Sequence, residues 1–138
     1  MLLVVVRLTN AGRILAGSLV AYIVFDVLLT PPAHLETRDP SRVTGLGIAT
    51  LALLFAGLAL SIVALVLMFR KSALWPMFAI VAGVLYFPAP LAELTGYFSS
   101  LRPPNAIAWI ELVQTVVAVV VIGVGIWVRQ QAMEATNK

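Results

Sequence analysis

The sequence predicts an all-α integral membrane protein, a four-transmembrane-helix up-down bundle formed by a single domain, residues 1–138. Hydrophobic residues make up 62% of the chain and charged residues 11%, with a mean hydropathy of +1.05. Because a soluble domain averages about 25% charged residues, this chain has too few polar groups to cover a globular surface. Four apolar stretches are long enough to cross a bilayer, and the short turns between them make neighbouring spans antiparallel.

Several function classes are disfavoured by composition. The net charge of +3 comes from nine scattered Lys and Arg residues without a basic cluster, so no nucleic acid is expected as a partner. The absence of Cys excludes disulfides, thiolate ligands and Cys nucleophiles. A single histidine, His34, disfavours a His-based metal site within one chain. No glycine-rich phosphate loop is present, and we expect no cofactor and no bound metal.

The first span is expected at about residues 8–30. Arg7 and Arg13 precede its apolar core, as in a signal sequence, but Pro31 and Pro32 follow it in place of a small-residue cleavage site. We therefore expect a retained span. The two prolines are expected to stop it or to open a short surface helix.

The second span is expected at about residues 43–69, a stretch without charge or proline. Gly57 and Ser61 lie four residues apart in it, and small residues at this spacing allow close contact between helices in lipid. A contact within the chain is the favoured interpretation of this pair. A homo-oligomer interface remains the alternative. Residues 70–72 then form a tight basic turn.

The third span is expected at about residues 73–99, with Trp75 as an interfacial anchor near its start. Pro76 suits the first turn of a helix. Pro88 and Pro90 should kink or break the helix, because each removes a backbone donor and crowds the preceding turn.

The fourth span is expected at about residues 106–128, with Trp109 and Trp127 near its two ends, as in an aromatic belt at both interfaces. The polar tail, residues 129–138, is expected to fray. Lys and Arg favour one side of the bundle by six to three: Arg7, Arg13, Arg70, Lys71, Arg129 and Lys138 against Arg38, Arg42 and Arg102. The positive-inside rule then places both termini in the cytoplasm, with the plasma membrane as the expected location.

Three acids lie inside these apolar spans: Asp26, Glu93 and Glu111. A carboxylate facing lipid is costly, so such residues usually face the bundle interior or a wet cavity. Helix rise places Asp26 about 6 Å, Glu93 about 9 Å and Glu111 about 7–8 Å below the outer ends of their spans. The matched depth predicts one cluster, in which these three acids are the catalytic candidates.

Helical periodicity gives each acid polar neighbours on its own face. Tyr22 shares a face with Asp26, Tyr86 and Tyr97 share one with Glu93, and Gln114 shares one with Glu111. The predicted substrate-contacting residues are those near the same outer end: Tyr22, Tyr86, Tyr97, Trp109, Gln114 and Arg102.

This set of side chains suits acid/base chemistry on a lipophilic molecule that enters from the membrane. Three carboxyl groups in a low-dielectric pocket cannot all ionise cheaply, so a neutral one can donate a proton while an ionised neighbour accepts one. Tyrosine phenols can donate hydrogen bonds to a developing oxyanion. We expect an isomerase, a cyclase or an epoxide-opening enzyme.

Two other functions remain open. One is a proton- or cation-coupled small-molecule transporter or lipid-binding protein. The chain resembles the small multidrug exporters in layout only. Those exporters use a membrane-embedded Glu in the first span. In this chain the acid of the first span is Asp26, which lies late in the span and away from the midplane where transporter sites lie. The other is an accessory subunit of a larger membrane complex, which the small size of the chain and its charge-free second span permit. Separately, Asp26 or Glu93 can have a structural role, paired with Arg102, Arg38 or Arg42 near the interface.

Overall fold

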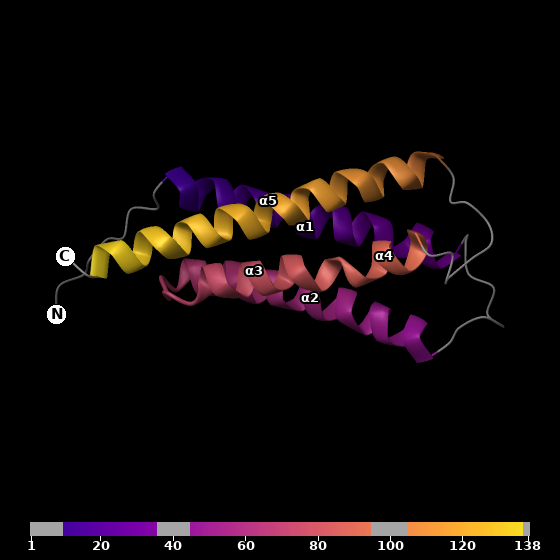
Figure 1. Ribbon diagram of the computed structural model, residues 1–138, viewed down its shortest axis with the longest axis horizontal. Helices are drawn as coiled ribbons and strands as arrows, with labels where there is room; N and C mark the ends of the chain where they lie inside the picture. Colours follow the sequence, from indigo (N-terminus) through magenta and orange to yellow (C-terminus); the bar gives the residue numbers. More distant parts are fainter. Residues whose placement is uncertain (1–9, 36–44, 95–104, 137–138) are drawn as a thin grey trace.

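A computed structural model describes residues 10–35, 45–94 and 105–136, and these residues are helical apart from short connections (Figure 1). The helices are α1 (Asn10–Leu35), α2 (Gly45–Phe69), α3 (Trp75–Tyr86), α4 (Pro88–Leu94) and α5 (Asn105–Thr136). Because α4 continues α3 after one residue, the fold is a four-helix arrangement whose third helix is broken. The rods run alternately in opposite directions, so that α1 begins and α5 ends at the same end.

The four rods form two pairs. α1 packs mainly on α5, the first helix on the last, and α2 packs mainly on α3. The pairs meet chiefly where α3 packs on α5 (Figure 1). Toward the end of the bundle that contains α4, α2 and α5 diverge from one another in this view.

Three helices of the described chain are long and apolar enough to cross a membrane, within Asn10–Leu28, Ile48–Phe69 and Ala108–Glu134. Their outer faces carry large apolar side chains, whereas small and polar residues fill much of the interior. This arrangement suits a lipid solvent, in which exposed Leu, Val and Ile are not penalised and small residues let helices approach closely. Together the three spans indicate an integral membrane protein.

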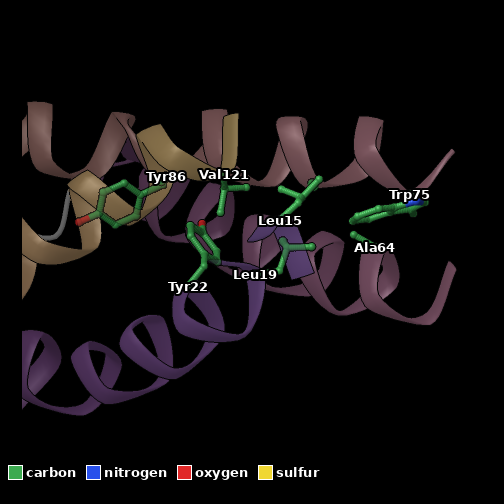
Figure 2. Close-up of a cluster of buried hydrophobic side chains, with 9 residues drawn as sticks. Leu15, Leu19, Tyr22, Ala64, Trp75, Tyr86 and Val121 are labelled. Carbon is green, nitrogen blue, oxygen red and sulfur yellow. The ribbon is translucent and has the colours of Figure 1, made fainter. Parts of the chain in front are cut away.

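One buried cluster runs along the bundle, from Tyr86 at one end to Trp75 at the other, with Leu15, Leu19 and Val121 between them (Figure 2). All four rods contribute to it. Glycines bring α3 and α5 together along this cluster. A Cβ on Gly83 would lie 2.8 Å from Ile122 Cγ1 and 3.2 Å from the Ala118 carbonyl oxygen, so these backbones approach too closely for a side chain.

The tight basic turn predicted between α2 and α3 is present. Lys71 adopts a φ of 56°, and the N–H of Ser72 donates to the Leu67 carbonyl at 2.9 Å while the N–H of Lys71 donates to Met68 at 2.9 Å. These two bonds form a Schellman motif, which satisfies the last carbonyls of α2 and reverses the chain. Pro76 occupies the first turn of α3, as predicted.

The predicted break in the third helix is also present, at Phe87. Pro88 has no N–H to donate to Val84, and the N–H of Phe87 donates to the Val84 carbonyl instead, at 3.3 Å. Phe87 keeps helical dihedrals, and Leu91 donates back to its carbonyl at 3.2 Å. The proline therefore separates α3 from α4 with little change of backbone conformation.

Three details differ from the sequence-based expectations. α1 continues through Pro31 and Pro32 to Leu35, beyond the apolar span that ends at Leu28. The prolines leave backbone carbonyls without a donor, but outside the apolar span water can solvate these carbonyls. The expectation that the tail frays is wrong for its described part. Up to Thr136 the tail continues α5, because most of its residues are good helix formers. Trp75 is not an interfacial anchor, because it is only 8% exposed within the buried cluster.

Candidate functional site

Asp26 lies on the buried face of α1. Its residue exposure is 6%, and Tyr22, one turn earlier, is fully buried. The buried positions Leu15, Leu19, Tyr22 and Asp26 follow the spacing of one helical face. Ser18 lies at the edge of this face and donates to the Ile14 carbonyl at 2.9 Å. α1 thus carries an ionisable group into the bundle interior.

The hydroxyl of Tyr22 joins three helices. It donates to the Ala82 carbonyl oxygen of α3 at 3.1 Å. Gly57 of α2 leaves the room for this bond, because a Cβ there would lie 3.1 Å from the Tyr22 Oη and 3.2 Å from the Ala82 oxygen. Gly57 is therefore a contact within the chain, as the Gly57/Ser61 spacing predicted.

Gln114 joins α5 to the same turn of α1. Its side chain is fully buried, and Nε2 donates to the Tyr22 carbonyl oxygen at 3.3 Å. In an α-helix this carbonyl also accepts from the N–H four residues later, that of Asp26. The carboxamide of Gln114 therefore lies beside the turn that leads from Tyr22 to Asp26. Its other atom, Oε1, is buried and accepts no hydrogen bond from the described residues.

Tyr86 forms the third connection, between α3 and α5. Its hydroxyl donates to the Glu111 backbone carbonyl at 3.2 Å and lies 3.5 Å from the Thr115 hydroxyl. Thr115 donates to the same carbonyl at 2.8 Å. The rings of Tyr86 and Tyr22 meet edge to face, with centroids 6.2 Å apart. The two tyrosines and Gln114 thus form one polar cluster, which we call the tyrosine cluster, with Asp26 one turn beyond it.

Antiparallel packing places Asp26 and Glu111 toward the same end of the bundle. Asp26 lies four residues beyond Tyr22 along α1, about 6 Å. Glu111 lies three residues before Gln114 along α5, about 4.5 Å in the same direction because the two helices run oppositely. The two acids therefore occupy similar levels along the bundle. The Glu111 residue is half-buried, whereas that of Asp26 is buried.

The remaining predicted residues lie outside this cluster or outside the described part of the chain. Trp109 is 66% exposed on α5 and does not point into the bundle. Eighteen residues separate it from Trp127, which is also exposed, a rise of about 27 Å that suits a membrane-spanning helix with one aromatic at each interface. The backbone of Glu93 belongs to α4, but its side chain is outside the described residues, as are Tyr97 and Arg102.

Sequence reasoning missed two partners in the tyrosine cluster. Ala82 contributes only its backbone oxygen, for which a sequence offers no signal. Thr115 follows Gln114 in the chain, and helical periodicity alone does not predict that its hydroxyl donates to the Glu111 carbonyl. Within the described ranges, no group of three His, Cys, Asp or Glu residues could hold a metal ion.

A comparison with protein families gives one match. The family model described as "Domain of unknown function (DUF8051)" matches residues 11–138. The chain belongs to this family. No curated protein and no solved structure matches the chain. The DUF8051 match begins one residue after the start of α1 and includes every later helix, so the tyrosine cluster lies wholly within the shared region.

Chemically, the site combines a buried carboxyl group with aromatic rings held in fixed orientations. The hydroxyls of Tyr22 and Tyr86 donate to backbone carbonyls of other helices, so they position their rings and connect the bundle. Asp26 provides the titratable group. The arrangement therefore places a buried carboxyl group one helical turn from the buried ring of Tyr22.

Proposed function

We propose that this DUF8051 protein is a membrane-embedded acid/base enzyme that acts on a lipophilic small molecule, with Asp26 as its central catalytic group. The chain forms one domain of four membrane spans, of which the third is the broken helix α3–α4. Both termini face the cytoplasm, and the protein resides in the plasma membrane. The substrate comes from the lipid bilayer, and no cofactor is used.

The burial of Asp26 inside a membrane-length helix is the observation on which this proposal depends. Ionisable residues in such helices are expensive and usually mark a functional site. Asp26 lies one turn from Tyr22 and Gln114, where α1, α3 and α5 are joined by hydrogen bonds. A carboxyl group next to such a fixed point of the bundle is suited to chemistry, because catalysis needs reacting groups in fixed orientations.

An isomerisation of a double bond is the simplest reaction that these residues support. In its protonated form, the Asp26 carboxyl adds its proton to one carbon, and the π electrons form the new C–H bond. The carboxylate of Glu111, or that of Glu93, removes a proton from the carbon next to the resulting cation, and the double bond re-forms one position along. The proton then returns to Asp26. Tyr22 and Tyr86 present aromatic rings, which stabilise a nearby cation by their quadrupoles.

Charge-neutral variants test this proposal. We expect Asp26→Asn to lose at least 100-fold in turnover, the lower range for removal of a general acid, while keeping the melting temperature of the wild type. Glu111→Gln and Glu93→Gln show which of the two acids is the base, because only the variant that lacks the base should lose turnover. Glu134→Gln is the matched control, because Glu134 is an exposed acid near the other end of α5. Products are sought by mass spectrometry of a lipid extract incubated with each purified variant, and the pH–rate profile should be bell-shaped.

An accessory role in a larger membrane complex is the second candidate. It is favoured by the hydrogen bonds of the tyrosine cluster, which end on backbone carbonyls and therefore hold helices together. Under this alternative, Asp26→Asn and Glu111→Gln lower the melting temperature and no lipid product appears with any variant. Proton-dependent uptake into vesicles, without chemical change of the solute, would instead identify a transporter.

A further inference from the structure

The turn between α2 and α3 has a lysine where the end of a helix favours glycine. Lys71 has a φ of 56° and occupies the position after the C-cap in the Schellman motif described above. Glycine is the usual residue at such a position, because a side chain destabilises this backbone conformation. Residues held in this way are concentrated at functional sites and ligand clamps. The side chain of Lys71 therefore points to a role beyond closing the turn.

Arg129 of α5 lies at the same end of the bundle, on the side of α5 that faces α3. Ile122 and Gly125 pack against α3, and Arg129 follows them by seven and four residues, the spacing of one helical face. A Cβ on Gly125 would lie 3.5 Å from the Pro76 carbonyl oxygen. Arg129 is about 6 Å further along α5 from this contact. The turn at Lys71 lies in the same direction, beyond the start of α3 (Figure 1).

Arg70 adds a third cation next to Lys71, and we call Arg70, Lys71 and Arg129 the basic surface. The three side chains are exposed, and none of them forms a hydrogen bond or an ion pair within the described ranges. Among the acids of the described part of the chain, Glu134 lies near this end. It follows Arg129 by five residues, a spacing that turns it toward another side of α5. No described acid therefore neutralises the basic surface.

Exposed aromatic side chains lie next to these cations in the chain, on the membrane side. Phe69, the last residue of the apolar span in α2, is 79% exposed and directly precedes Arg70. Trp127 is also exposed and precedes Arg129 by two residues, about 3 Å of helix rise. The cations therefore lie at the boundary between the hydrocarbon region and the headgroups. A phospholipid matches this pattern, with an acyl chain against the aromatics and a phosphate against the cations.

We propose that the basic surface binds the phosphate of an anionic phospholipid headgroup. Arg and Lys donate charge-assisted hydrogen bonds to phosphate oxygens, and each basic residue near a membrane surface favours anionic lipid. A zwitterionic headgroup carries its own cation, so the surface should prefer lipids without one. An acidic protein segment matches the charge but not the lipid-facing aromatics. The site lies toward the opposite end of the bundle from Asp26, and it is independent of the acid/base proposal.

Lipid titration of the full chain in detergent micelles, followed by native mass spectrometry, tests the proposal. The probes are phosphatidylglycerol and phosphatidylcholine with identical acyl chains. Lys71→Gly is the main variant, because glycine suits a φ of 56° and the turn keeps its fold without the charge. Arg129→Gln removes a second cation. Arg13→Gln is the matched control, since Arg13 is exposed on the outer side of α1, two residues from each of the buried Ala11 and Leu15.

We expect the wild type to bind phosphatidylglycerol about ten-fold more tightly than phosphatidylcholine. Lys71→Gly and Arg129→Gln should each weaken phosphatidylglycerol binding about five-fold, and the double variant about 25-fold, because each basic residue contributes separately. Lys71→Arg should bind like the wild type, and so should Arg13→Gln. Equal binding of the two lipids by the wild type overturns the proposal. An equal loss in Arg13→Gln and Lys71→Gly also overturns it, because net charge would then explain the preference.

Melting temperatures in nanodiscs give a second readout. Phosphatidylglycerol should raise the Tm of the wild type above its value in phosphatidylcholine. Lys71→Gly should melt no lower than the wild type in phosphatidylcholine, because glycine relieves the turn, but it should gain less from phosphatidylglycerol. An equal gain in both proteins overturns the role of Lys71.

Two further probes separate the lipid from other anions. Inorganic phosphate alone and a poly-glutamate peptide should not raise the Tm of the wild type in phosphatidylcholine nanodiscs. If phosphate raises it as much as phosphatidylglycerol does, the ligand is free phosphate and the lipid assignment is overturned. If the peptide does so and Lys71→Gly removes the effect, the partner is an acidic protein segment, which also overturns the lipid assignment.

Discussion

The part of the bundle around Leu19 and Trp75 is apolar and packed side chain against side chain (Figure 2). The part around Tyr22 and Gln114 is instead joined by hydrogen bonds to backbone carbonyls. Both parts use the same helices and both are buried. In the apolar part, the helices are held by close packing. Gly125 of α5 lies so near α3 that a Cβ on it would be 2.7 Å from Ile80 Cγ1.

The difference shows how one bundle combines apolar packing with a polar interior. Lipid surrounds the helices and is as apolar as their side chains, so packing and interhelical hydrogen bonds must hold them together. In the apolar part, packing alone does this. In the tyrosine cluster, hydrogen bonds replace part of the packing and give the buried amide nitrogen of Gln114 an acceptor. Three substitutions test this division, from the largest expected effect to the smallest.

Gly57→Leu should be the most damaging. The new side chain would enter the space beside Tyr22 Oη and the Ala82 oxygen, where a Cβ alone would lie 3.1 and 3.2 Å away. We expect a loss of about 3 kcal/mol in the free energy of unfolding, from overpacking and from the broken hydrogen bond. Denaturation in mixed micelles measures it. Leu58→Ala should cost less, and Gly17→Leu should be nearly silent because a Cβ on Gly17 meets nothing within 4 Å. Equal stability of Gly57→Leu and the wild type would contradict the close contact.

Leu19→Ala tests the apolar part. Leu19 is fully buried in the cluster, so its truncation leaves a cavity. In a membrane the transfer component of the usual 2–5 kcal/mol loss is absent because the unfolded reference also lies in lipid, and we expect about 2 kcal/mol from lost packing. The same denaturation assay applies, with the exposed neighbour Val20→Ala as the control. An unchanged free energy for Leu19→Ala would show that packing does not stabilise this part.

Tyr22→Phe should have the smallest effect. It removes the bond to the Ala82 oxygen but keeps the ring and its contact with Tyr86. Interhelical hydrogen bonds in membranes contribute about 0.6 kcal/mol on average, so a loss of that size is expected, with a similar value for Tyr86→Phe. A loss above about 2 kcal/mol would mean that the tyrosine cluster depends on each single bond. Its hydrogen bonds would then contribute more to stability than the packing of the apolar part.

Much of the fold could be predicted from the sequence, because it depends on local signals. Composition and segment length indicated a membrane protein, Pro88 indicated the break after Tyr86, and the Gly57/Ser61 spacing indicated a close helix contact. The burial of Trp75 could not be predicted in this way. It depends on how the turn at Lys71 folds α3 back onto α2, and an aromatic at the end of a span is otherwise typical of an interface.

The candidate site was predictable only in part. Periodicity placed Tyr22 and Asp26 on the buried face of α1 and Gln114 on that of α5. It could not show that the tyrosine hydroxyls donate to the backbone of other helices, because those partners depend on the rotation and register of whole helices. Trp109 was grouped with the site by depth alone, but depth does not specify direction, and its helical position turns it outward. The roles of Glu93, Tyr97 and Arg102 stay predictions, since their side chains lie outside the described residues.

The pairing of α1 with α5 has a consequence for biosynthesis. Gln114 and the Tyr22 carbonyl that it contacts are 92 residues apart, so α1 meets its main partner only after almost the whole chain has been made. At about 5–20 residues per second, this delay is about 5–20 s. During that time α1, which carries Asp26, lacks its main packing partner in the membrane. The early chain therefore depends on the translocation machinery, or on α2 and α3 which follow, to keep α1 in place until α5 arrives.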